Sequence, residues 1–264
     1  MVLALLPMFA AKQSLMKDKS WEQYGDKEPY FGVCTDPRYK TKNLNEAALK
    51  DFFQSGEQHV SEVLTKLKSY FPLADLNSFQ NVLDFGCGTG RLLIPFAQRF
   101  PKVTGVDIAS GMLSEAKKNL EQRNLHNVEL VQSADITTHH FATPFDFVHT
   151  YIVLQHIPVK FGYPIIDKLI DSTKQDGYGM IQFTYANHLS AATNRRNKLK
   201  AEYKWYHQLS NILKGQSPNV PLMQMNNYDL PRVFSILKKH KLKQTCLDFT
   251  DHGGFLGVCI YFRK

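Results

Sequence analysis

The chain has 264 residues, of which 43% are apolar and 21% are charged, and its formal net charge at pH 7 is +8. This length and apolar fraction suffice for one sizeable hydrophobic core, and they exclude an intrinsically disordered chain. The sequence contains neither an internal repeat nor a low-complexity segment, which excludes repeat architectures.

The positive charge is concentrated in one part of the chain. Residues 187–243 carry eleven Lys and Arg side chains against Glu202 and Asp229 alone, so the remainder is close to neutral. A basic coat over the whole chain, as in nonspecific nucleic-acid binding, is therefore not present. A local basic segment indicates a site for an acidic substrate, a face toward an anionic surface, or an ordinary solvated helix face.

The cysteines and the N-terminus indicate the cellular setting. Cys34, Cys87, Cys246 and Cys259 show no CxxC spacing and no cluster with histidine. We therefore expect no metal site, no disulfide framework and a reducing, cytoplasmic location. The run MVLALLPMFAAK (residues 1–12) lacks the preceding Lys or Arg of a secretory signal and is too short to span a bilayer. We expect a packed or frayed terminal segment there and no membrane span in the chain.

Helical and strand patterns alternate along the chain. Residues 44–71 carry apolar side chains at intervals of three and four, which predicts a helix interrupted near Ser55–Gly56. Downstream, apolar and β-branched runs predict strands over 81–85, 102–107, 127–132, 145–151 and 179–185. Between and after them, helices are predicted over 91–100, 110–123 (capped by Ser110), 160–174 and 227–241. The segment TDHGG joins two final strands over 242–249 and 255–262, which predicts an antiparallel hairpin.

This order predicts an α/β fold with a doubly wound, seven-stranded, mostly parallel sheet and a C-terminal antiparallel strand pair. We divide the chain into a helical N-terminal extension, residues 1–77, and an α/β domain, residues 78–264. Residues 186–227, after the fifth strand, are too long for an ordinary connection and are expected to form a lid-like helical insertion. One amphipathic helix is predicted there from the spacing of Leu199, Tyr203, Tyr206, Leu209 and Leu213.

The stretch VLDFGCGTGR (82–91) is the candidate ligand-binding loop, with three alternating glycines after a strand that contains Asp84. It departs from the dinucleotide fingerprint GxGxxG, because the third glycine comes one residue early and Arg91 takes a glycine position. Ligands of open α/β sheets bind at the carboxyl ends of the strands. Asp107 ends the second strand and can accept hydrogen bonds from both ribose hydroxyls, and Asp135, after the third strand, can bond an adenine amino group.

These motifs, in this order, resemble the class I S-adenosylmethionine-dependent methyltransferases from about residue 78 to the C-terminus. VLDFGCGTGR matches the family's acidic-residue and GxGxG motif. VTGVD, VELVQSAD and FDFVHTYIVLQHIP match the motifs that follow, and the final strand pair matches the family's sheet edge. The resemblance implies an enzyme with S-adenosyl-L-methionine as cofactor and S-adenosyl-L-homocysteine as product.

The resemblance also implies roles for individual residues. Gly86, Cys87 and Gly88 would line the methionine part of the cofactor, and Asp107 would hold the ribose. Ile108 and Met112 would flank the adenine, and Asp135 and Ile136 would cover its other edge. Tyr151 would face the sulfonium or serve as a core residue. The implied cofactor site is completed by Asp84 and Gly90.

The acceptor and the catalytic base are less specified. The chain has HTYI where base and glutamine methyltransferases carry Asn/Asp-Pro-Pro-Tyr, so we expect methyl transfer to an O or N atom of a small or medium-sized metabolite that can be anionic. Candidate bases are His149, His156, His188, Asp251 and His252. We retain His156 and His252 as catalytic candidates, although loop geometry and a hairpin turn also explain them.

Several alternatives stay open at this point. The basic segment 187–243 allows an RNA or protein methyltransferase, with nucleic acid the less favoured partner, and a non-catalytic cofactor-binding module is a further candidate. An NAD oxidoreductase conflicts with Arg91 where a glycine should pack. The aromatic segment WEQYGDKEPYFGV (21–33) either folds over the cofactor or contributes Tyr24, Tyr30 and Phe31 to the core.

Overall fold

The computed structural model describes residues 20–215 and 217–264, so the segment predicted over residues 1–12 lies outside the described part. Its centre is a seven-stranded sheet with the order β3-β2-β1-β4-β5-β7-β6. The strands are β1 (Asn81–Phe85), β2 (Lys102–Asp107), β3 (Val128–Gln132), β4 (Phe145–Thr150), β5 (Thr173–Asn187), β6 (Gln244–Asp251) and β7 (Phe255–Arg263). β1 to β5 pair in parallel, and β7 runs antiparallel to both β5 and β6. The predicted mostly parallel sheet with an antiparallel pair is confirmed.

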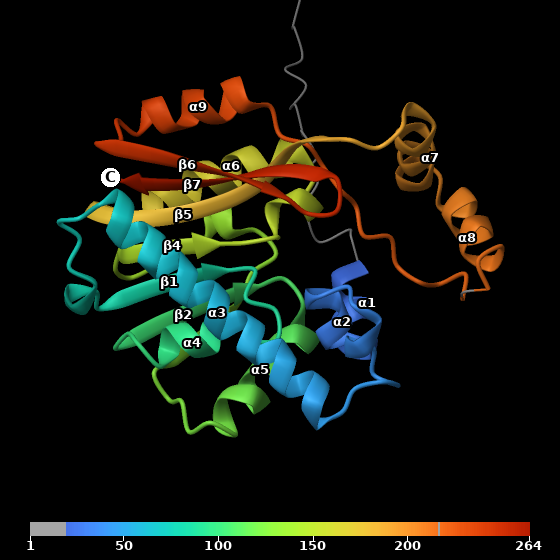
Figure 1. Cartoon of the computed structure of the whole chain (residues 1–264), viewed down its shortest axis with the longest axis horizontal. Coiled ribbons are helices and arrows are strands. Elements are labelled where there is room, and N and C mark those ends of the chain that lie inside the picture. The colour runs from blue at the N-terminus through green and yellow to red at the C-terminus, as the bar shows by residue number, and fades with distance from the viewer. Residues whose placement is uncertain (1–19, 216) are drawn as a thin grey trace, which may run out of the picture.

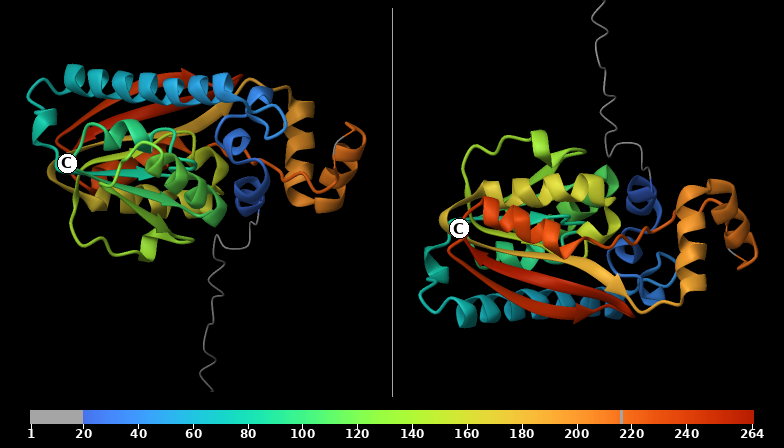
Figure 2. Two further views of the ribbon diagram at one scale, coloured as in Figure 1. Left: turned by 90° about the horizontal axis from the view of Figure 1, so that it is seen from below. Right: turned by 90° about the horizontal axis from the view of Figure 1, so that it is seen from above.

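Helices cover both faces of this sheet (Figures 1 and 2). One face packs against α3 (Glu46–Tyr70), α4 (Leu93–Ala97) and α5 (Ser110–Glu121), and the other against α6 (Val159–Ser172) and α9 (Leu230–Lys239). Burial on both faces explains why β1 and β4 are buried at every position, including the polar side chains of Asp84 and His149.

The predicted interruption of the long N-terminal helix at Ser55–Gly56 is wrong. α3 runs unbroken from Glu46 to Tyr70, and Asn45 caps it by accepting a hydrogen bond from the backbone N–H of Ala48 at 2.9 Å. Gly56 serves close packing instead, because a Cβ atom there would lie 2.1 Å from the carbonyl oxygen of Arg91. Tertiary contact therefore explains this mid-helix glycine.

The predicted cap of α5 by Ser110 is also wrong. Ser110 is the first helical residue, and Ala109 at the N-cap provides no side-chain hydrogen bond. Glu22 of α1 (Ser20–Lys27) accepts hydrogen bonds from the backbone N–H of Ser110 at 3.1 Å and from its Oγ at 3.0 Å. A carboxylate at a helix N-terminus complements the helix dipole, so α1 is anchored to the α/β domain by electrostatics.

The insertion contains two helices where one was predicted. α7 (Ala191–Glu202) ends at Tyr203, whose backbone is extended with φ −118°, and α8 (Lys204–Ile212) starts directly after it. Both helices stand away from the sheet in all three views (Figures 1 and 2). Among the described helices, none combines the length and the apolar character needed to cross a bilayer.

Candidate active site

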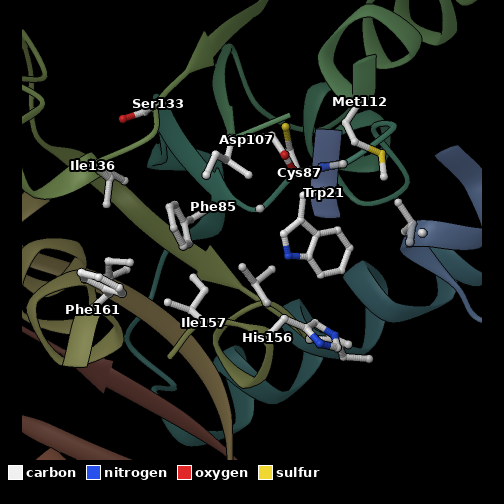
Figure 3. A pocket seen from close by; sticks show the side chains of 18 of the residues that line it. Trp21, Phe85, Cys87, Asp107, Met112, Ser133, Ile136, His156, Ile157 and Phe161 are labelled. Atoms are coloured by element: carbon white, nitrogen blue, oxygen red, sulfur yellow. Dashed lines mark hydrogen bonds between the residues drawn. The ribbon is translucent and has the colours of Figure 1, made fainter. Parts of the chain in front are cut away.

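A cavity of about 640 Å³ opens at the carboxyl ends of β1, β2 and β4 (Figure 3). Trp21 of α1, together with Gly32 and Val33 of α2 (Pro29–Val33), contributes a wall from the N-terminal helices. Of the site residues expected from the sequence, those that line the cavity are Asp84, Gly86, Cys87, Gly88, Asp107, Ile108, Met112, Ile136, Tyr151 and His156. Gly90, Asp135 and His252 lie outside its lining.

Two positions of the glycine loop, Gly86 and Gly88, have no room for a side chain. Gly86 and Gly88 have φ values of +79° and +53°, a region that side-chain-bearing residues rarely adopt. A Cβ atom at Gly86 would lie 2.2 Å from a methyl group of Val153, and one at Gly88 would lie 2.7 Å from a methyl group of Val33. The backbone of the loop therefore forms the cavity wall directly, and a ligand can approach its peptide groups.

Asp107 ties this loop to the end of β2. Its Oδ2 accepts a hydrogen bond from the backbone N–H of Gly88 at 2.9 Å, and its Oδ1 accepts one from Ala109 at 2.9 Å. Burial raises the pKa of Asp107, while these backbone donors act in the opposite direction. Each carboxylate oxygen retains acceptor capacity, so the side chain can also accept hydrogen bonds from two ligand hydroxyls.

Two buried charges of opposite sign line the cavity with unsatisfied atoms. Asp84 is 2% exposed and Arg91 is 8% exposed. Oδ2 of Asp84 and Nε of Arg91 have no hydrogen-bond partner within the described chain, and Arg91 forms no ion pair there. Buried polar atoms in native proteins are normally paired, so a ligand with complementary charge is the expected partner of both.

Sequence reasoning overlooked Arg91. The sequence placed Arg91 at the start of the helix predicted over 91–100 and assigned it no role in the site, whereas the structure buries its guanidinium against Ser55 of α3, with Nη1 to Oγ at 3.3 Å. The available signal was chemical: a permanent cation follows directly on a loop expected to hold a ligand.

Both ring nitrogens of His156 have a neighbour, a short contact at Nδ1 and a long one at Nε2, where the side-chain amide of Gln155 lies 3.4 Å away. It lies in η5 (Leu154–His156), and Nδ1 is 2.8 Å from the backbone carbonyl oxygen of Gln224. Because a carbonyl only accepts, Nδ1 must carry the proton, which assigns the lone pair of the neutral ring to Nε2. Burial lowers the pKa of His156, so the ring is neutral at pH 7. The Trp21 ring packs against it, with the ring centroids 5.2 Å apart.

The other candidate bases lie elsewhere. His149 is buried beneath the cavity, where Nδ1 contacts Oδ1 of Asp84 at 2.8 Å and Nε2 faces Nε2 of His59 at 3.4 Å. His252 contacts Tyr151 edge-on at a centroid distance of 5.8 Å. Asp251 accepts a hydrogen bond from the backbone N–H of Gly254 within the hairpin, and His188 is absent from the cavity lining.

Asp135 has a local structural partner. It caps η4 (Ile136–Thr138) by accepting hydrogen bonds from the backbone N–H of Thr137 at 3.0 Å and from its Oγ1. Ser133, Ala134 and Ile136 form this part of the cavity wall.

The two readings of the N-terminal aromatic segment each apply to different residues. Trp21 lines the cavity, whereas Tyr24 and Tyr30 are core residues with 6% exposure each. Tyr24 Oη donates a hydrogen bond to the carbonyl oxygen of Pro221 at 3.0 Å, which joins α1 to the insertion. No group of His, Cys, Asp or Glu side chains suited to a metal ion occurs within residues 20–215 and 217–264.

One segment of the chain matches a known protein family. Residues 82–177 match the family described as methyltransferase domain. The chain is 40% identical over 72 residues to aklanonic acid methyltransferase DauC from Streptomyces sp. (strain C5), which covers 26% of this chain and 33% of that protein. It is 32% identical over 84 residues to the 23S rRNA (uracil(1939)-C(5))-methyltransferase RlmD of Aliivibrio fischeri (strain MJ11), covering 32% of this chain and 18% of that protein.

These alignments span a third or less of the two relatives. The fold extends further: the crystal structure of magnesium protoporphyrin IX methyltransferase (ChlM) from Synechocystis PCC 6803 with bound SAH superimposes with a TM-score of 0.62 at 17% identity, covering 92% of this chain and 97% of that chain. The family match lies on the strands that carry the glycine loop, Asp107 and the start of the loop after β4. Residues 82–177 therefore form a methyltransferase domain, and together with the fold these matches indicate a class I S-adenosylmethionine-dependent methyltransferase.

Proposed function

We propose that this protein transfers a methyl group from S-adenosylmethionine to an O or N atom of a small or medium-sized metabolite. The observation that carries the proposal is one cavity lined by the glycine loop, by Asp107 and by His156. A cofactor held by the loop and an acceptor held beside a neutral histidine would thus share one enclosed space.

The residues present fit this cofactor. The side-chain-free loop at Gly86 and Gly88 leaves backbone exposed to the ligand, and Asp107 is the ribose acceptor. The unsatisfied atoms of Asp84 and Arg91 complement the ammonium and carboxylate groups of an amino-acid zwitterion, which the methionine part of the cofactor carries. Gly90 and Asp135 support the site indirectly. Gly90 turns the chain toward α4, and Asp135 holds the loop that bears Ile136.

The proposed chemistry needs alignment and one proton acceptor. When bound, S-adenosylmethionine supplies a methyl group already activated on a sulfonium sulfur. Nε2 of His156 accepts the proton of an acceptor hydroxyl or ammonium, and the Gln224 carbonyl holds the ring in the tautomer that makes this feasible. Burial raises the pKa of Tyr151 to about 12, so its hydroxyl remains protonated and can orient ligands as a donor. Trp21 limits the access of water.

The far end of the cavity suggests the class of acceptor. Ile157, Phe161 and Ile165 form an apolar wall, and Lys160 and Lys204 line the same cavity. An acceptor with an apolar body and an anionic group satisfies both features. Similarity to an enzyme named for aklanonic acid supports a small-molecule acceptor of this kind.

Residues 186–227 are the proposed lid over this cavity. Ala201, Lys204 and Gln224 contribute to its lining, and Pro221 is tied to Tyr24 of α1. The insertion and the N-terminal helices therefore meet across the cavity opening, and their separation would admit the acceptor.

Transfer of a labelled methyl group tests the proposal. The full chain is incubated with methyl-labelled S-adenosylmethionine and panels of phenols, sugars, amines and carboxylic acids. We expect label in at least one class, enriched among compounds that carry an anionic group. Label confined to RNA or protein, with activity that falls steeply as salt rises, would support a macromolecular substrate through the basic segment. Cofactor binding without any methyl transfer would support a non-catalytic module.

A further inference from the structure

The helix α8 (Lys204–Ile212) has its polar face turned inward and its apolar face turned outward. On the inner face, His207 Nε2 lies 2.8 Å from the carbonyl oxygen of Val220, and Asn211 Nδ2 donates to the same oxygen at 3.1 Å. Asn211 is only 4% exposed. A helix that packed on a protein core would show the reverse arrangement.

The outward face is a cluster of large apolar side chains. Five of the nine large apolar side chains that are exposed in the described chain lie within residues 203–213. The five are Tyr203, Trp205, Leu209, Ile212 and Leu213. From Trp205 onward their spacing is four, three and one, which places them on one side of the helix. We call these five residues the α8 apolar face.

Positive charge is concentrated in the two helices of the insertion and the residues that follow them. Residues 190–215 contain six basic side chains against Glu202 alone, namely Arg195, Arg196, Lys198, Lys200, Lys204 and Lys214. None of the six forms an ion pair with another described residue. Burial and the neighbouring charges of Lys214 and Arg196 lower the pKa of Lys200, so these three cations lie near one another.

An apolar helix face with tryptophan and tyrosine, bordered by lysine and arginine, is the arrangement of helices that lie in the interface of a lipid bilayer. We propose that α7 and α8 form a docking surface for an anionic bilayer, with the α8 apolar face inserted among the acyl chains and the exposed cations facing anionic headgroups, namely Arg195, Arg196, Lys198, Lys204 and Lys214. Both helices project from the body of the molecule, so no other described element obstructs a flat surface there (Figures 1 and 2).

Two other occupants fit less well. A second copy of the chain would bring two sets of unpaired cations together, which opposes self-association through this face. RNA would pair with the cations, but aliphatic residues such as Leu209, Ile212 and Leu213 provide neither stacking nor hydrogen bonds for bases. A bilayer satisfies the charge and the apolar side chains together.

The docking surface borders the cavity. Lys204 begins α8 and lines the cavity, and it directly precedes Trp205, which is 64% exposed. A molecule docked through α8 would hold its cavity opening close to the headgroups. Binding to the bilayer itself does not depend on the proposed methyl transfer, so vesicle experiments and activity assays can fail separately.

Flotation of the full chain with vesicles tests the proposal. One vesicle contains phosphatidylcholine alone, and the other contains phosphatidylcholine mixed with phosphatidylglycerol. We expect binding to the anionic vesicles, a partition coefficient at least about tenfold lower on the neutral ones, and weakening with added salt. Brominated acyl chains should quench Trp205 in a Trp21→Phe variant, whose folding is checked by circular dichroism.

Leu213 and Leu73 provide a matched pair of exposed leucines, 80% and 90% exposed respectively. Leu209→Ser/Leu213→Ser should reduce the partition coefficient by about tenfold or more, whereas Leu73→Ser should leave it unchanged. The proposal is overturned by any of three results: no binding to anionic vesicles, equal loss in both variants, or dimerisation without vesicles that the double variant abolishes. Preference for polyuridylic acid over anionic vesicles would assign the surface to RNA and overturn it likewise.

Discussion

The imidazole Nδ1 of His149 lies 2.8 Å from the carboxylate oxygen Oδ1 of Asp84, and neither side chain is more than 3% exposed. The bond joins adjacent strands, since Asp84 and His149 are register partners in β1 and β4. It holds the carboxylate so that its second oxygen remains unpaired at the cavity that Asp84 lines. The pair therefore links the sheet core to the proposed cofactor site.

Removing the histidine from this pair should destabilise the fold. His149→Ala leaves a buried carboxylate without its partner, and we expect the free energy of unfolding to fall by about 3 kcal/mol. Urea denaturation measures the change. His126→Ala, at an exposed position, is the control and should be neutral. A loss below about 1 kcal/mol for His149→Ala would mean that the carboxylate finds other partners.

Arg91 should contribute to binding only of ligands that carry the amino-acid part of the cofactor. Arg91→Met removes the charge while keeping an apolar stem, and it should weaken S-adenosylhomocysteine binding about tenfold to a hundredfold, as the loss of a charge-assisted hydrogen bond does. The ligand 5′-methylthioadenosine has no carboxylate, so its affinity should not change. Calorimetry with both ligands measures the two effects. Equal weakening of both would show that Arg91 acts only through the shape of the cavity.

His59 should make the protein sensitive to acid. Burial and the neighbouring His149 lower the pKa of His59 from 6.5 to about 2. The unfolded chain therefore takes up a proton below pH 6.5 that the folded chain excludes, and stability falls as the pH falls. The slope for this group approaches 1.4 kcal/mol per pH unit, about 2 kcal/mol between pH 6.5 and pH 5.

The variant His59→Gln isolates this effect. It should be less stable than the wild type at pH 7, where the buried histidine is neutral and well packed, yet lose less stability on acidification. Urea denaturation at a series of pH values gives the two curves. Parallel curves would contradict a buried, neutral His59.

His156 and His252 can be separated by activity. With an acceptor found in the screen, His156→Gln should reduce kcat by about a hundredfold or more, the usual contribution of a general base. His252→Gln should retain most activity, since His252 does not line the cavity. Because burial lowers the pKa of His156, the wild-type rate should be level from pH 7 upward and fall only in acid. Full turnover by His156→Gln at every pH would rule out this assignment.

The sheet could be predicted from the sequence because its signals are local. The parallel strands follow short runs rich in apolar and β-branched residues, and TDHGG is short enough that it must join an antiparallel pair. The predictions of a helix interruption and of a helix cap were wrong where residues distant in the sequence determine the structure. Gly56 accommodates the backbone of Arg91, and the N-terminus of α5 is capped by Glu22, which accepts a hydrogen bond from the backbone N–H of Ser110.

The position of the candidate site on the sheet could also be predicted from the sequence. Glycines and strand-end acids occupy positions that the chain order alone brings to one sheet edge, and Asp107 lies where it was expected. The side-chain direction of Asp135 could not be predicted, because the nearby Thr137 donates hydrogen bonds to its carboxylate. The break between α7 and α8 at Tyr203 could not be predicted either. The apolar spacing continues across this residue, and only its extended backbone divides the two helices.

Titration calorimetry with S-adenosylhomocysteine tests the central claim most directly. The wild-type chain should bind one equivalent at micromolar concentration, and Asp107→Ala should lose about tenfold or more in affinity as the ribose acceptor and the loop anchor disappear together. Asp51→Ala, at an exposed aspartate, should bind like the wild type. No heat of binding at high micromolar ligand, or an unchanged affinity in Asp107→Ala, would contradict the assignment of this cavity to the cofactor.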